Sequence, residues 1–158
     1  MLKGIDPLLG PQLLAVLCDM GHGDEIAVVD ANFTARKLAG AKPILRLDGV
    51  GLLRACQAVT SVFPLDAFVT RPVGYMQVSG APAGHVADVH REVLDHLHQQ
   101  GIASPEQCEG IERFAFYDRV ATAQAFLVTG ELRPYGNFLF KKGVLAAVDL
   151  PGPSSVSP

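Results

Sequence analysis

Apolar side chains recur at helical spacing in three stretches of the chain, residues 11–20, 52–63 and 83–97. In each stretch Leu, Val or Cys returns every three or four positions, which places these side chains on one face of a helix. Proline or glycine adjoins the ends of the stretches, as is typical of helix boundaries. The pattern therefore predicts three amphipathic helices.

Shorter apolar runs lie between and after these stretches, bounded by Gly, Pro, Asp or Asn. Such runs are typical of strands. Residues 32–41 are predicted to form a loop, Ser104–Gln107 a capped helical turn and residues 118–124 a short helix. The predicted strands cover residues 26–29, 43–47, 73–78, 113–117, 125–129 and 137–141.

Strands that alternate with helices favour a single three-layer α/β domain with a mostly parallel central sheet. We assign residues 1–148 to this domain. Residues 149–158 are rich in Pro and Ser, and we expect them to form a disordered C-terminal tail, since they have too few apolar side chains to bury. In parallel sheets ligands bind beyond the carboxyl ends of strands, and Asp30 follows the first strand directly.

Composition narrows the classes of function. The 158 residues are 49% hydrophobic, enough for a sizeable core, and the net charge is -3 with 13 scattered Lys and Arg. A nucleic-acid partner is not expected from such a balance. No apolar run approaches the ~18 residues that span a bilayer, and the first residues lack the pattern of a signal peptide. We therefore expect a cytoplasmic protein with no membrane partner.

Motifs for cofactors and metals are missing from the sequence. Cys18, Cys56 and Cys108 are odd in number and widely spaced, which favours neither disulfides nor a zinc site. Gly49-Val50-Gly51 lacks the third glycine of a dinucleotide fingerprint. Four histidines in the third helical stretch show no metal-binding spacing, and we interpret them as a solvated face: His85, His90, His96 and His98.

Candidate functional residues occur at four places in the chain. They are His22 between two glycines, Asp30 after a strand, Arg113 before an aromatic run, and Tyr135-Gly136-Asn137 near the end. Each has an ordinary structural explanation, such as a turn, a loop cap or a surface ion pair. Together they suggest an acid/base site for a small polyhydroxy ligand, because imidazole transfers protons and the other groups hydrogen-bond hydroxyls.

Several segments together resemble the fucose mutarotase and ribose pyranase family, most closely its fucose branch. The resemblance runs from residue 1 to about 144. Departures are Thr34, where the family usually has proline, a loose match over residues 66–107, and an extra tail beyond Val148. The matching segments are Met1–Ile5, Met20–Ile26, Asp30–Phe33, Arg113–Arg119, Thr129–Glu131, Tyr135–Asn137 and Lys141–Gly143.

This resemblance implies an L-fucose mutarotase with His22 as catalytic acid/base and Asp30, Arg113, Tyr135 and Asn137 as monosaccharide contacts. It implies no metal and no cofactor. It also implies a homodecamer of stacked pentamers with sites near subunit interfaces. The alternatives are a D-ribose pyranase, whose members carry histidine where this chain has Arg113, and a non-catalytic sugar-binding module.

Overall fold

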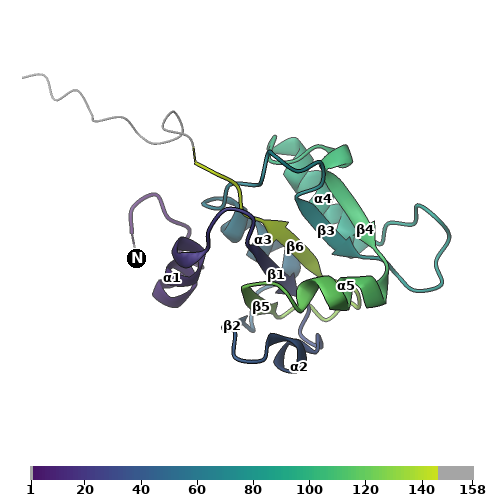
Figure 1. The fold of residues 1–158 in the computed structure, drawn as a ribbon, viewed down its shortest axis with the longest axis horizontal. Coiled ribbons are helices and arrows are strands. Elements are labelled where there is room, and N and C mark those ends of the chain that lie inside the picture. Colours follow the sequence, from purple (N-terminus) through teal and green to yellow (C-terminus); the bar gives the residue numbers. More distant parts are fainter. Residues whose placement is uncertain (1, 146–158) are drawn as a thin grey trace, which may run out of the picture.

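The computed structural model describes residues 2–145. It is an α/β fold in which a central sheet is covered by helices on both faces (Figure 1). The helices are α1 (Pro11–Asp19), α2 (Ala35–Ala39), α3 (Leu52–Thr60), α4 (Asp88–Gln99) and α5 (Arg113–Val120), with one 3-10 turn, η1 (Pro105–Gln107). The strands are β1 (Glu25–Val29), β2 (Ile44–Leu47), β3 (Val73–Met76), β4 (Cys108–Ile111), β5 (Ala125–Thr129) and β6 (Phe138–Lys141).

The six strands follow the order β2-β5-β1-β6-β3-β4. Strand β6 is antiparallel to both of its neighbours, while the β2–β5, β1–β5 and β3–β4 pairs are parallel. Val28 pairs with Phe138, and Glu25 pairs with Lys141. The start of β6 therefore lies beside the end of β1, and the end of β6 lies beside the start of β1.

Each face of the sheet has its own hydrophobic core, which confirms the predicted three layers. On one face Ile26 and Val28 of β1 pack with side chains of α1, α3 and α4. On the other face Ala27 and Val29 pack with side chains of α2 and α5. All five residues of β1 are buried, as are those of β5. Strand β1 is thus held rigidly between the layers, with chemistry available only at its two ends.

The strand predicted over residues 113–117 is wrong, because these residues begin helix α5. The Glu112 carboxylate caps this helix by accepting hydrogen bonds from the backbone N–H groups of Phe114 and Ala115. Phe116 and Val120, one helical turn apart, are buried, whereas Phe114 is exposed. Burial at this spacing is a helical pattern that the short aromatic run obscured.

Other predicted boundaries need smaller corrections. Residues 35–39, predicted to be loop, form helix α2, and strand β4 was not predicted. The third long helix begins at Asp88 rather than near residue 83. No helix within residues 2–145 combines the length and apolar character needed to cross a membrane. Residues 146–158, which include the predicted tail, lie outside the described part of the chain.

Candidate functional site

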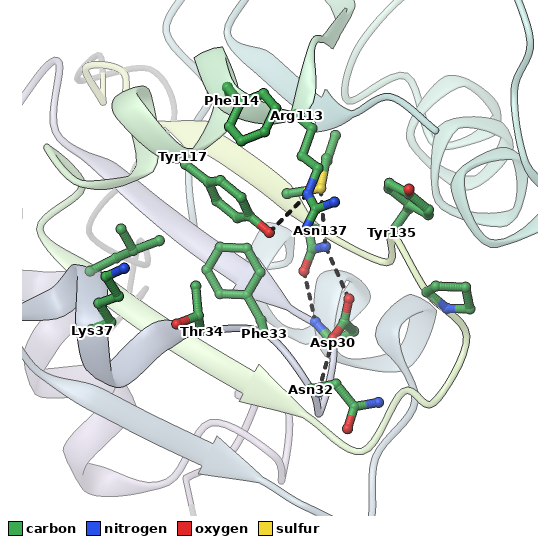
Figure 2. A pocket seen from close by; sticks show the side chains of 13 residues that line it. Asp30, Asn32, Phe33, Thr34, Lys37, Arg113, Phe114, Tyr117, Tyr135 and Asn137 are labelled. Carbon is green, nitrogen blue, oxygen red and sulfur yellow. Dashed lines mark hydrogen bonds between the residues drawn. The ribbon is translucent and has the colours of Figure 1, made fainter. Parts of the chain in front are cut away.

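A pocket of about 760 Å³ opens beyond the carboxyl end of β1 (Figure 2). Side chains reach it from the loop after β1, from helices α2 and α5, from β3 and from the loop before β6. Four of the five predicted site residues line this pocket: Asp30, Arg113, Tyr135 and Asn137.

Asp30 and Asn137 form a reciprocal pair at the base of the pocket. The Asn137 amide nitrogen donates to Asp30 Oδ2 at 3.0 Å, and Asn137 Oδ1 accepts from the Asp30 backbone N–H at 3.0 Å. The Asn32 backbone N–H donates to Asp30 Oδ1 at 2.9 Å. Both side chains are buried, and burial raises the pKa of Asp30 above its ordinary value despite these hydrogen bonds. The carboxylate is thus desolvated and fixed in direction, well placed to accept a ligand hydroxyl.

Arg113 lies at the start of α5, on the rim of the pocket. Its guanidinium stands 5.5 Å from the centre of the Tyr117 ring, and its Nε donates to the Tyr117 hydroxyl at 3.2 Å. Figure 2 shows both side chains pointing toward each other above Phe33. One N–H is used in this contact, and the rest of the guanidinium fork remains for a ligand.

Tyr135 has φ 65°, the left-handed value that a non-glycine residue rarely adopts, and no other non-glycine residue in the described chain shares it. A hydrogen bond with Ser79 and the charge of Arg113 lower the pKa of its hydroxyl. The next residue but one, Asn137, donates its backbone N–H to the Tyr135 carbonyl at 2.7 Å. Strained backbone of this kind persists only where its surroundings hold it, and it often marks a functional site.

His22 lies away from this pocket, at the opposite end of β1. It follows α1 on a turn in which Gly23 has φ 86°. Its Nε2 is 3.1 Å from Asp66 Oδ1, and its ring meets the edge of Phe68 at 5.5 Å between centres. The imidazole is 48% exposed while the Asp66 side chain is 3% exposed. Within one chain, therefore, the structure does not bring the predicted acid/base group to the predicted sugar contacts.

Asp66 is the residue of this second cluster that sequence reasoning missed. Its backbone N–H donates to the Lys141 carbonyl at 3.0 Å, and the neighbouring Gly143 approaches Leu65 so closely that a Cβ would lie 2.4 Å from the Leu65 oxygen. Burial raises the pKa of Asp66, but hydrogen bonds from Phe68 N–H and His22 and the nearby positive charges outweigh it and leave this pKa lowered. A fixed carboxylate behind an exposed imidazole orients the ring, a common arrangement for an acid/base histidine.

Lys142 fixes the chain just before His22. Its ammonium donates to the carbonyls of Leu17 and Met20 at 2.6 and 2.5 Å, at the end of α1. Its backbone accepts from Gly23 N–H at 2.8 Å. The turn that carries His22 is therefore bound to the end of β6, and the exposed imidazole projects from a rigid base.

The sequence of this chain is similar to those of known proteins. Residues 3–145 match the model of the RbsD / FucU transport protein family. The chain is 41% identical over 146 residues to an L-fucose mutarotase of Actinobacillus pleuropneumoniae, covering 91% of this chain and 97% of the relative.

Two solved structures share this fold at different degrees of sequence identity. The crystal structure of a fucose mutarotase in complex with L-fucose from Streptococcus pneumoniae superposes with a TM-score of 0.82 at 32% identity, covering 92% of this chain and all of that one. The structure of Bacillus subtilis RbsD complexed with D-ribose superposes with a TM-score of 0.68 at 19% identity, over 92% of this chain and all of that one. The second likeness extends to the fold alone.

Proposed function

This chain belongs to the RbsD / FucU transport protein family, and from that premise we propose that it is an L-fucose mutarotase. Such an isomerase interconverts the α and β anomers of the free sugar without a cofactor. The observation that carries the proposal is the convergence of Asp30, Arg113, Tyr135 and Asn137 in one pocket of a chain 41% identical to an L-fucose mutarotase. The likeness to the ribose-bound protein is more distant and does not favour the ribose alternative.

Mutarotation opens the cyclic hemiacetal, lets the freed aldehyde rotate and closes the ring on its other face. One group takes the proton of the anomeric hydroxyl while a proton is delivered to the ring oxygen, and closure reverses both transfers. Histidine titrates near neutral pH and can act in either direction. We assign this role to His22, with Asp66 as the partner that orients its ring.

The sugar carries no charge, so its recognition depends on directed hydrogen bonds. Asp30 accepts a hydroxyl proton, Arg113 donates to hydroxyl oxygens, and Tyr135 presents both a ring and a hydroxyl to the pocket. The Asn137 amide donates to Asp30 and fixes the direction of its carboxylate in the pocket. Groups that are desolvated in advance penalise a sugar that leaves one of them unpaired.

We further propose that the site is completed by a second copy of the chain in a homo-oligomer, in keeping with the decamer that the resemblance implies. The five residues of β1 separate His22 from Asp30, and at ~3.3 Å per residue this strand alone spans roughly 17 Å. No side-chain rotation closes such a gap. His22 is half exposed beside Phe68, which is itself 78% exposed, so a neighbouring copy can cover both.

We assign the protein to the cytoplasm. Its three cysteines all lie in the described chain and are unpaired, and Cys56 is wholly buried as a thiol. Free thiols of this kind suit a reducing compartment.

The direct test is saturation-transfer NMR between the α and β signals of free sugars, with L-fucose, D-ribose, D-galactose and L-rhamnose as the panel. We expect enzyme-dependent exchange that is fastest for L-fucose. Faster exchange of D-ribose would favour the pyranase. Line broadening by bound sugar without any exchange would indicate a non-catalytic sugar-binding module.

Shared sites can be tested by co-expression of two inactive variants, His22→Ala and Asp30→Asn. If each pocket combines Asp30 of one chain with His22 of another, about a quarter of the pockets in a random mixed oligomer are intact, and activity returns. If both residues must come from the same chain, no pocket is intact and the mixture stays inactive. The matched control is each variant expressed alone, at the same total concentration.

A further inference from the structure

Helix α4 carries a histidine that is entirely buried, contrary to the predicted solvated face. His90 has 0% of its surface exposed. Its ring packs against Tyr75 at 4.9 Å and Phe138 at 6.0 Å between centres. The surroundings are aromatic and apolar, and an imidazole is an unusual choice for such a place.

The imidazole makes one polar contact. Its Nε2 lies 2.7 Å from the backbone carbonyl oxygen of Tyr135. A carbonyl can only accept, so Nε2 must carry the hydrogen. In the neutral ring Nδ1 is then bare, and it has no hydrogen-bond partner among residues 2–145. Burial lowers the pKa of His90 and favours this neutral form.

A buried nitrogen without a hydrogen-bond partner is unfavourable for folding. A phenyl ring would fill the same aromatic box without that cost. What the imidazole supplies and a phenyl ring cannot is the N–H directed at Tyr135. The need for a hydrogen-bond donor to the Tyr135 carbonyl therefore explains a histidine at position 90 better than packing does.

That carbonyl belongs to the strained turn at the edge of the pocket. It also accepts the Asn137 backbone N–H at 2.7 Å, so two donors converge on one oxygen. Tyr135 holds φ 65°, and a Cβ on Gly136 would lie 3.1 Å from Glu131 and 3.3 Å from Val89. The turn is thus confined by packing beneath Gly136 and by hydrogen bonds at the carbonyl before it.

We propose that His90 is a positioning residue for the sugar site: its Nε2–H anchors the Tyr135 carbonyl and so holds the turn that presents Tyr135 and Asn137 to the ligand. This inference rests on the proposed function, because it takes these two side chains as sugar contacts. His90 itself is sealed beneath the turn and touches no reacting atom. Its loss should weaken sugar binding more than it slows proton transfer.

The variants His90→Phe and His90→Gln separate these effects. Phenylalanine keeps the ring volume and removes the donor, while glutamine can return an amide N–H near the position of Nε2. We expect His90→Phe to raise the KM for L-fucose exchange about tenfold, because the hydrogen bond that holds the Tyr135 carbonyl is lost. The kcat should change less than about threefold. His90→Gln should recover most of the affinity. Leu97→Val, a buried change two turns along α4, is the control for general loosening of the helix.

Two NMR measurements test whether His90 holds the turn at Tyr135, and neither depends on catalysis. The ring nitrogens of His90 should show the neutral tautomer with hydrogen on Nε2. The Asn137 backbone amide should exchange with solvent faster in His90→Phe than in wild type or in Leu97→Val. The proposal is overturned by hydrogen on Nδ1, by an unchanged Asn137 exchange rate, or by a wild-type KM in a folded His90→Phe protein. A wild-type protein that catalyses no sugar exchange would refute the proposed function instead, while the two NMR results would still decide whether His90 holds the turn.

Discussion

The two ends of strand β1 are built in opposite ways. At its carboxyl end Asp30 is buried, hydrogen-bonded on both oxygens and desolvated. At its amino end His22 is half exposed, with one carboxylate behind it. The first arrangement fixes its hydrogen-bonding groups in advance within one chain. The second leaves an imidazole half exposed on a rigid base, with Asp66 behind it. In the function that we propose, the first end binds the sugar, and the second transfers the proton in a site that another copy of the chain completes.

Strand β6 links these two ends because it runs antiparallel to β1. Asn137 precedes β6 and contacts Asp30, while Lys141 and Lys142 at its other end hold the loops around His22. Near this amino end Glu25 is buried in an ion cluster, with Arg119 at 2.7 Å and Lys141 at 3.2 Å. The distance between Asp30 and His22 is therefore fixed by two paired, buried strands, and a mobile loop does not set it.

The largest expected effect is at the amino end. His22→Ala should reduce L-fucose exchange by about two orders of magnitude or more, since a positioned acid/base group typically contributes ~10² to 10⁴-fold. Sugar binding should persist, because Asp30, Arg113 and Asn137 are untouched. Exchange NMR measures the rate of anomer exchange, and line broadening of the ligand signals measures sugar binding. His98→Ala, an exposed histidine on α4, is the control. Wild-type exchange in His22→Ala with a native circular-dichroism spectrum would refute the assignment.

The next effect belongs to the pocket end. Arg113→His removes the guanidinium fork, and we expect it to weaken L-fucose exchange by about 2 kcal/mol, the scale of a hydrogen bond from a charged donor. D-ribose exchange should fall much less, since histidine is the residue of the ribose branch. Arg36→His, on an exposed part of α2, is the matched control.

The informative quantity for Arg113 is the ratio of the two sugars' exchange rates. A ratio that changes would show that the pocket end sets sugar preference. Equal losses for both sugars would instead make Arg113 part of the shared catalytic machinery, and the contrast between the two ends would fail at this residue.

A smaller effect is expected where the buried carboxylate orients the imidazole. Asp66→Asn should lower exchange by about tenfold, less than the loss of the imidazole itself, because an amide orients the His22 ring less well and does not stabilise its protonated form. If Asp66 acts only through His22, the same substitution in a His22→Ala background should change exchange no further. An additional loss in that background would show that Asp66 supports the structure or the sugar directly.

How much the sequence could predict differs between the two ends. Asp30 and Tyr135-Gly136-Asn137 were recognisable because each follows a local signal, a buried strand or a proline turn. Their contact with each other was not, since it depends on the antiparallel direction of β6, which no local pattern shows. Asp66 carried no signal of its own: its role comes from a pairing with the chain near Lys141 that only the folded sheet creates.

Two predictions are wrong at places where the sequence carries a usable signal. Residues 113–117 were predicted to form a strand because five residues are too few to separate helical from extended spacing. The better signal was Glu112, whose carboxylate caps α5. The interpretation of His90 as part of a solvated face is wrong because all four histidines are treated alike there. His90 lies three residues before Val93 and seven before Leu97, so helical spacing places it on the buried face of α4.

The smallest effect concerns acid stability, and it has opposite signs at the two ends. Burial raises the pKa of Asp30, so its ionisation opposes folding: the contribution to stability is present at low pH and is lost as pH rises through that raised pKa. The pKa of Asp66 is lowered, so its contribution is present above the ordinary value and is lost as pH falls through the lowered one.

We therefore expect Asp66→Asn to lower the melting temperature at pH 7 by a few degrees, with a penalty that shrinks toward pH 3. Asp30→Asn removes a buried charge, but its NH2 group faces one of the two N–H donors that the carboxylate oxygens accept from, so we expect it to lower the melting temperature. This penalty should grow as pH falls, because wild type gains stability when the buried carboxyl is protonated and the variant does not. Thermal unfolding of wild type and both variants between pH 3 and pH 7 measures the two trends. Parallel curves for the two variants would mean that both carboxylates respond to acid alike. The contrast between a desolvated pocket end and a paired amino end would then not extend to their electrostatics.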